Sequence, residues 1–155
     1  MTTPDPRLGA DLRLLANLQH GNEWTGGSDL LTTTVPSQHG QPPLTDLQTV
    51  QGGQNMQQAL LLRFLTRQGA LAALGHPDYG SRLYTLIGQL NTATNRNLAK
   101  LYVLEALAPE PRVERVISVD VSGARDTLDI RVSLTAIGSN TPLNMVFGFN
   151  IGGPQ

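Results

Sequence analysis

The last third of the chain alternates between apolar and polar residues with a period of two. Successive side chains of a β-strand point to opposite faces, so this pattern buries one strand face and leaves the other in water. The apolar members of the three runs are Val113, Ile117, Val119 and Val121, then Leu128, Ile130, Val132, Leu134 and Ala136, then Leu143, Met145, Phe147, Phe149 and Ile151. Ser122-Gly123 and the segment at 138–142, GSNTP, supply turn residues between the runs. The pattern predicts a three-stranded antiparallel meander with one buried face.

The middle of the chain carries apolar residues at helical spacing instead. Three helices are expected, over residues 55–66 with Asn55 as cap, 83–90, and 92–107 with Thr92 or Thr94 as cap. A short strand over residues 46–50 precedes the first helix, and Gly52-Gly53 stops that strand. Helices grouped before a run of strands favour an α+β fold. The expected architecture is three helices packed on a small, mainly antiparallel sheet that ends in the three-stranded meander.

The length of 155 residues fits one domain with a sizeable core. Residues 1–28 are expected to form an N-terminal extension that includes a short amphipathic stretch with leucines at helical spacing. Residues 29–155 then form a single domain, in which 32–43 is an exposed polar connection. We read no secretion signal at the start, and the longest apolar run is too short to span a bilayer.

Composition argues against several classes of function. The net charge is −1, and the arginines are spread from Arg7 to Arg131 among acidic residues without a basic patch, which argues against nucleic-acid binding. Cysteine is absent, which excludes a disulfide framework, a thiolate nucleophile and a cysteine-based zinc site. His20, His39 and His76 lie far apart and match no metal-ligand spacing. The sequence therefore predicts no metal and no cofactor.

Paired carboxylates are the catalytic arrangement that remains, because glycoside hydrolysis requires only two of them. The glutamates are Glu23, Glu105, Glu110 and Glu114. Glu105 shares a helical stripe with Leu98 and Leu101, which would partly bury it as a candidate general acid; the alternative is a helix-end carboxylate paired with an arginine. Aromatic residues make up only 5% of the chain, which is few for a sugar-cleaving cleft. A non-enzymatic role is favoured, with a carboxylate-based, lysozyme-like peptidoglycan hydrolase as the alternative.

The tripeptide Glu110-Pro111-Arg112 lies at the junction between the last predicted helix and the first strand of the meander. Because Pro111 fixes the backbone, the two charges are expected at a defined separation on opposite sides of a rigid bend. Arg112 could then offer its guanidinium to a partner's carboxylate, and Glu110 could accept from another arginine. The alternative is a simple helix stop in which Glu110 pairs internally, with Arg63 as the candidate. Spacing alone does not separate the two interpretations.

Several segments occur together in the order and approximate spacing of a known family. They are DLQTVQGG at 46–53, the helix segment at 55–69, Pro77-Asp78-Tyr79-Gly80-Ser81, Glu110-Pro111-Arg112-Val113 and Asn144-Met145-Val146-Phe147. Together they resemble the baseplate wedge and sheath-initiator family of contractile tails, over residues 44–151. That family includes phage baseplate wedge subunits, the type VI secretion baseplate subunit and subunits of extracellular contractile injection particles. Residues 1–28 and 32–43 lie outside the resemblance.

The resemblance implies a partner-binding surface. Glu110, Pro111 and Arg112 match the family motif that contacts other wedge subunits. Arg63 and the loop residues Asp78, Tyr79 and Gly80 are expected to contribute to partner binding as well.

The resemblance also implies how the sheath attaches. The small sheet is expected to accept extended arms of the first sheath ring by strand addition, along residues 142–151 or 113–121. Expected partners are other wedge proteins, the sheath protein, and tube or hub proteins, with no nucleic acid and no membrane insertion. The protein would be cytoplasmic during assembly and later part of a phage tail or injection particle. Some family members carry a lysozyme label, for which the carboxylates described above give no support.

Overall fold

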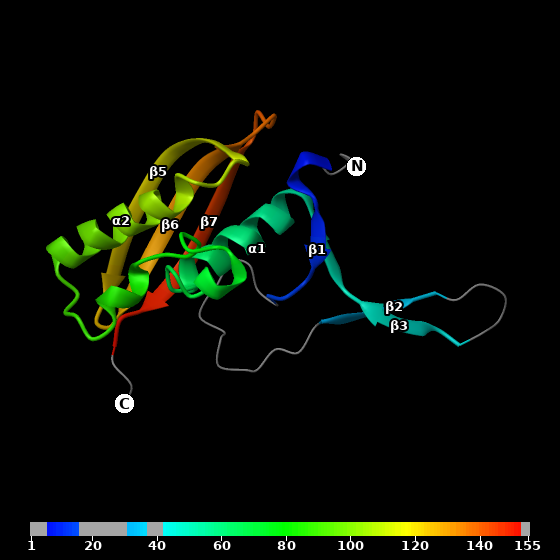
Figure 1. Ribbon diagram of the computed structural model, residues 1–155, viewed down its shortest axis with the longest axis horizontal. Helices are drawn as coiled ribbons and strands as arrows, with labels where there is room; N and C mark the ends of the chain where they lie inside the picture. Colours follow the sequence, from blue (N-terminus) through cyan, green and yellow to red (C-terminus); the bar gives the residue numbers. More distant parts are fainter. Residues whose placement is uncertain (1–5, 16–30, 37–41, 153–155) are drawn as a thin grey trace.

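The computed structural model describes residues 6–15, 31–36 and 42–152, and its main body is two helices packed on a three-stranded sheet (Figure 1). The sheet consists of β5 (Val113–Ala124), β6 (Thr127–Ala136) and β7 (Pro142–Asn150), antiparallel and in that order. Helices α1 (Gly52–Leu65) and α2 (Ala93–Leu107) cover one face, α1 nearer β7 and α2 nearer β5. The predicted meander is confirmed.

The buried face of the sheet is built mostly by the alternating residues that the sequence indicates. All five apolar members of the β6 run are buried, as are Met145, Phe147, Phe149 and Ile151 in and after β7. Phe147 stacks on Phe64 of α1 with ring centroids 5.2 Å apart, which joins the sheet to the helix layer. In β5, the residues that face the core differ from those that the alternating pattern predicted. Register shifts beside Val113 and Val116 let Val116 pack inward and turn Ile117 to solvent.

The prediction of three helices on one sheet is wrong. Residues 83–90 form only a 3-10 turn, η3 (Leu83–Leu86), and the described ranges hold two α-helices plus the 3-10 segments η1 (Pro6–Leu8) and η2 (Ala72–Leu74). Leu83 and Leu86 are buried, but Leu90 is 79% exposed. The predicted helical face therefore packs on the core only in its first turn. Gly88 adopts a φ of +81°, a left-handed conformation through which a right-handed helix cannot continue.

Helix α1 begins earlier than the sequence indicates. Gly52 and Gly53, expected to stop a strand, are its first residues. Asn55, the predicted cap, is buried and donates from Nδ2 to the Leu8 carbonyl at 2.8 Å. Helix α2 begins as expected, because the Thr92 hydroxyl accepts a hydrogen bond from the backbone amide three residues later at 3.2 Å.

Small sheets outside the meander also contradict the expectation of one sheet. Strand β1 (Ala10–Leu12) pairs antiparallel with β4 (Thr49–Gln51), although the leucines from Leu12 onward have helical spacing in the sequence. The buried side chain of Gln58 in α1 holds this segment. Its Nε2 donates to the Leu12 carbonyl and its Oε1 accepts from the Leu14 amide, both at 2.8 Å.

A second two-stranded sheet projects from the body as a hairpin (Figure 1). It consists of β2 (Thr32–Val35), which lies in the expected polar connection, and β3 (Leu44–Leu47). The single strand expected over residues 46–50 is instead divided between β3 and β4. His20, His39 and Glu23 lie outside the described residues. Within the described part of the chain, no helix is long and apolar enough to cross a membrane.

Candidate docking site

Glu110 is the centre of a partly buried charge cluster, which we call the Glu110 cluster: Glu110, Arg63, Arg112 and Tyr79. Glu110 is 6% exposed. Its Oε1 accepts from Arg112 Nε at 2.7 Å, and its Oε2 accepts from Arg63 Nη2 at 3.3 Å. The internal pairing with Arg63 is therefore present. The expectation that Pro111 holds the two neighbouring charges apart is wrong, because the Arg112 side chain turns back across the bend onto Glu110.

Opposing influences act on the Glu110 carboxyl. Burial, the largest single influence, disfavours the charged form and acts to raise the pKa of Glu110. The hydrogen bonds and charge of Arg112, together with the charge of Arg63, outweigh burial, so the pKa of Glu110 lies below its ordinary value. The same contact raises the pKa of the Arg112 guanidinium. Glu110 is thus held as an ion-paired carboxylate, which is the wrong protonation state for a general acid.

Tyr79 connects the Asp78-Tyr79-Gly80 loop to the cluster. The Arg63 guanidinium lies over the Tyr79 ring, with its Cζ 4.7 Å from the ring centroid. Burial raises the pKa of the Tyr79 hydroxyl, against the opposing influence of Arg63. The Tyr79 carbonyl accepts from the Gly69 amide at 3.2 Å, which fixes the loop just beyond the end of α1. Gly80 is buried, and Asp78 is exposed.

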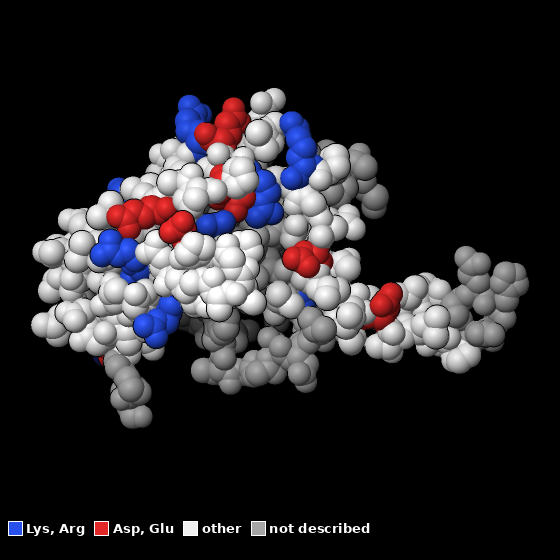
Figure 2. All heavy atoms as spheres, in the orientation of Figure 1, with Lys and Arg blue, Asp and Glu red and all other residues white. Residues whose placement is uncertain are grey.

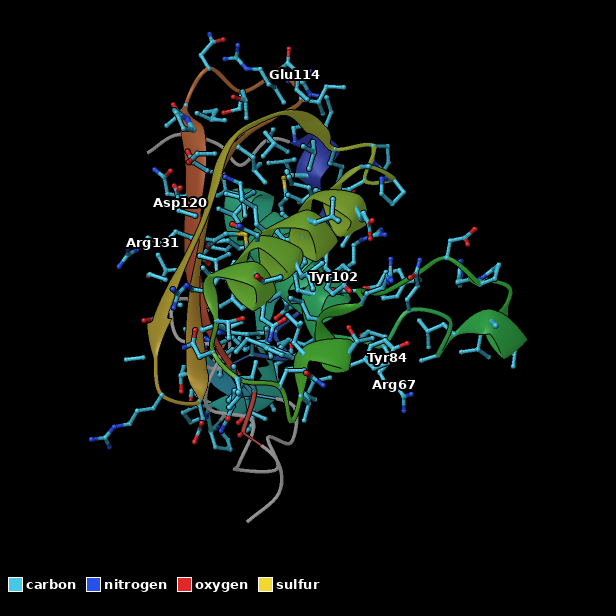
Figure 3. The ribbon with its side chains drawn as sticks, turned by 90° about the vertical axis from the view of Figure 1, so that its left-hand side faces the viewer. Arg67, Tyr84, Tyr102, Glu114, Asp120 and Arg131 are labelled. Carbon is cyan, nitrogen blue, oxygen red and sulfur yellow. The ribbon has the colours of Figure 1, made fainter. Side chains whose placement is uncertain are left out.

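The other tyrosines also lie beneath arginines, an arrangement that no pattern in the sequence predicted. Arg67 Cζ is 4.6 Å from the Tyr84 ring centroid, and Arg82 Cζ is 4.7 Å from that of Tyr102. Figure 3 shows Arg67 and Tyr84 side by side beyond the end of α1. Each pair joins segments at least 17 residues apart, a separation at which no sequence pattern indicates contact. The Arg82–Tyr102 stack joins the loop between α1 and α2 to α2, and the Arg67–Tyr84 stack joins two parts of that loop to each other.

The other glutamates that the structure describes, Glu105 and Glu114, are both exposed. Glu105 is 45% exposed and bonds Arg82 at 3.6 Å, so the expectation of a partly buried Glu105 is wrong and the helix-end ion pair is present. Among the described residues, no group of three or more potential ligands could hold a metal ion. Figure 2 shows acidic and basic side chains interleaved over the body, without a surface of one sign on the face in view.

The two edges of the meander differ in charge. Strand β5 carries Glu114, Arg115 and Asp120, and charges on an edge strand oppose pairing with another chain. Strand β7 carries no charged residue, and its nine residues pair with β6 without a register shift. Asp120 and Arg131 lie on the sheet face that the helices leave uncovered (Figure 3).

The direction of the main-chain groups along β7 follows from one hydrogen bond. The Ile151 amide donates to the Asp126 carbonyl at 2.7 Å, in register with the β6–β7 ladder. Main-chain groups alternate along an antiparallel strand, so the odd-numbered residues of β7 face β6 and the even-numbered ones face away. The Asn144 carbonyl accordingly accepts from Gln57 Nε2 of α1 at 3.1 Å. No hydrogen bond from the described residues reaches the outward groups of Val146 and Gly148.

Of three comparisons with known proteins, the one with solved structures finds a similar fold. No protein-family model matches the chain, and no curated protein matches it. Among solved structures, the chain is similar to a "putative tail lysozyme" from Geobacter sulfurreducens, with a TM-score of 0.53 and 24% sequence identity. The similarity covers 61% of this chain and 86% of the Geobacter chain. A TM-score of 0.53 at 24% sequence identity indicates that the two chains share a fold.

Proposed function

We propose that this chain is a structural docking subunit of a contractile tail or injection machine, acting as a baseplate wedge component that nucleates the sheath. The motifs around Tyr79 and Glu110, in the order of the wedge family, support this role. The fold shared with the Geobacter protein supports it too, since that protein's name refers to a tail. The observation that carries the proposal is the uncharged edge of β7, whose outward main-chain groups at Val146 and Gly148 have no partner among the described residues.

In this proposal the first sheath ring contributes an extended arm that pairs with β7. Main-chain hydrogen bonds to Val146 and Gly148 would supply attachment, and the alternating exposed side chains would set the register. The charged β5 edge is the less suitable of the two candidates. The subunit would assemble in the cytoplasm and become part of the particle.

Other wedge proteins would dock at the Glu110 cluster, through Arg112. Its side chain is 27% exposed, and of its guanidinium nitrogens only Nε donates a hydrogen bond to Glu110. The remaining guanidinium N–H groups of Arg112 could donate to a carboxylate on a neighbouring subunit. Tube or hub proteins are further partners in this proposal.

Val146→Pro tests the β7 edge. Proline removes the outward amide of residue 146 but leaves the ladder to β6 intact, and Val146→Ala changes the side chain while keeping that amide. When the chain is expressed with its sheath and baseplate proteins, we expect Val146→Pro to lower the number of sheathed particles by about tenfold or more, because strand addition is blocked. Particles are counted by negative-stain electron microscopy. Val146→Ala should give about the wild-type count. Normal sheaths with the proline variant would exclude β7 as the docking edge.

A carboxylate-based peptidoglycan hydrolase is the second candidate, because the Geobacter protein is named a lysozyme. In this chain Glu105 is exposed and ion-paired with Arg82. Arg112 and Arg63 lower the pKa of Glu110 and so favour its ionised form, which does not suit a general acid. We expect the purified chain and its Glu105→Gln variant to clear a peptidoglycan suspension no faster than a buffer blank, as measured by turbidity. Clearing by the wild type that Glu105→Gln abolishes would replace the docking proposal with a hydrolase.

A further inference from the structure

The β2–β3 hairpin, which we call the arm, is built as an isolated structure. Every residue of β2 and β3 is exposed, and the arm extends away from the helices and the meander (Figure 1). An isolated two-stranded hairpin is at best marginally stable in water, and a third strand is what usually stabilises such a unit. Within the described part of the chain, no third strand pairs with the arm.

The two edges of the arm are not equivalent. The Gln48 amide donates to the Leu31 carbonyl at 2.7 Å, in register with the β2–β3 ladder. By the same alternation as in β7, the main-chain groups of Thr32 and Thr34 face away from β3, and on the opposite edge those of Thr45 and Leu47 face away from β2. On the β3 edge the outward amide of Leu47 already donates to Asp46 Oδ1 at 2.7 Å. On the β2 edge no hydrogen bond from the described residues reaches Thr32 or Thr34.

The side chains of the arm indicate the chemistry of the missing strand. Val35 and Leu44 are cross-strand partners on one face, and Leu44 is 62% exposed. Asp46 is the only charged residue of β2 and β3, and it bonds its own backbone neighbour. Figure 2 shows the arm as almost entirely uncharged. A charged strand or a phosphate backbone would find no counter-charge here, whereas an apolar side chain would cover Val35 and Leu44.

We propose that the arm is a second docking element, at which β2 pairs with one extended, uncharged segment of a different protein. That segment would carry apolar residues at alternate positions, so that one of them covers the pair of Val35 and Leu44. The added strand would make the arm a three-stranded sheet. This docking element is separate from β7 and from the Glu110 cluster, and it does not depend on the proposed function.

The test uses the full-length chain with Leu44→benzoylphenylalanine, a photoreactive residue, expressed together with the proteins encoded beside its gene. After irradiation, mass spectrometry identifies the cross-linked peptide. We expect one protein, cross-linked through a segment with alternating apolar residues. Adding Thr34→Pro, which removes the outward amide but none of the hydrogen bonds of the hairpin, should lower the cross-link yield about tenfold. Thr34→Ala, which keeps that amide, is the matched control and should stay within about twofold of the unsubstituted chain.

Four outcomes would overturn the proposal. They are a cross-link to a second copy of this chain, a cross-link within the same chain, no cross-link, and a cross-link whose yield Thr34→Pro leaves unchanged. Thermal unfolding of the Thr34→Pro and Thr34→Ala variants is measured alongside. Because the arm stands apart from the core, both variants should unfold at the same temperature, which shows only that the body is intact. Equal hydrogen exchange of the Thr33 and Val35 amides, which bond to β3, would show that the hairpin is intact as well, so a change in yield then reports on the outer edge of β2.

Discussion

Glu110→Ala should lower the free energy of unfolding by about 2–4 kcal/mol, because it removes the shared partner of two cationic side chains. Arg63 and Arg112 are 12% and 27% exposed, and neither has another carboxylate within ion-pair distance among the described residues. Breaking a fully buried pair costs more than this; here both guanidiniums can partly turn toward water, which limits the loss. Urea unfolding at neutral pH measures the effect.

Glu105→Ala is the matched control for this prediction. It removes a carboxylate of the same type from an ion pair with Arg82, but that pair is nearly half exposed on both sides. Exposed ion pairs contribute about 0–1 kcal/mol, so the control should unfold close to the wild type. Equal losses from the two substitutions would mean that burial around Glu110 adds nothing to its pairing.

The pH dependence of stability separates the effect of the Glu110 charge from the effect of the side chain's volume. The pKa of Glu110 is lowered in the folded chain, so its ionised form stabilises the fold. That stabilisation is fully present above the ordinary glutamate pKa of about 4.3 and is lost as pH falls toward the folded value. The stability difference between wild type and Glu110→Gln should therefore shrink as pH drops below about 4.3. A difference that stays constant over this range would show that the carboxylate charge is not responsible.

This stability effect changes how the motif must be tested for docking. A loss of particles in a Glu110 variant would follow from unfolding as readily as from a missing contact. Arg112 is the better probe, because it is more exposed than Glu110 and reaches the surface. Arg112→Lys keeps a cation but loses the planar guanidinium, so it separates recognition of a partner's carboxylate from simple charge balance.

The meander and α2 could be predicted because their signals are local. The period of two runs through all of β6 without interruption, and the hydroxyl of Thr92 marks the start of α2. The prediction of a helix over residues 83–90 is wrong for a physical reason. Helical spacing of apolar residues indicates a helix only if a core receives them, and Leu90 instead lies in solvent after Gly88 leaves the right-handed region.

The site was predicted only in part, because two of its contacts join distant residues and the third depends on the direction of a side chain. Opposite charge suggested Arg63 as a partner of Glu110, and the structure brings the two together. The rigid bend at Pro111 fixes the main chain but not the direction of the Arg112 side chain, which bonds Glu110 rather than extending away. Nothing in the spacing indicated that Tyr79 would lie beneath Arg63, since the intervening loop sets that approach.

Gly80→Ala should destabilise the chain by about 3 kcal/mol or more, because the residue is both left-handed and confined. Its φ is +112°, and an added Cβ would lie 2.7 Å from the main-chain carbonyl atoms of Arg67 and the carbonyl oxygen of Thr66. These are backbone atoms at the end of α1, so no side-chain rotation can relieve the contact. The Asp78-Tyr79-Gly80 loop would have to move, and Tyr79 would withdraw from Arg63. We expect a lower unfolding temperature together with a change in the environment of the tyrosines in near-UV circular dichroism.

Gly75→Ala is the control that isolates the close approach. Gly75 is also left-handed, with a φ of +89°, but an added Cβ there would meet no atom within 4 Å. Its substitution should cost only the conformational strain, about 1 kcal/mol, and leave the near-UV spectrum unchanged. The excess loss in Gly80→Ala then measures how tightly the loop is packed on the end of α1. If the two substitutions cost the same, the loop yields easily, and Gly80 is required only for its backbone conformation rather than for holding Tyr79 against the Glu110 cluster.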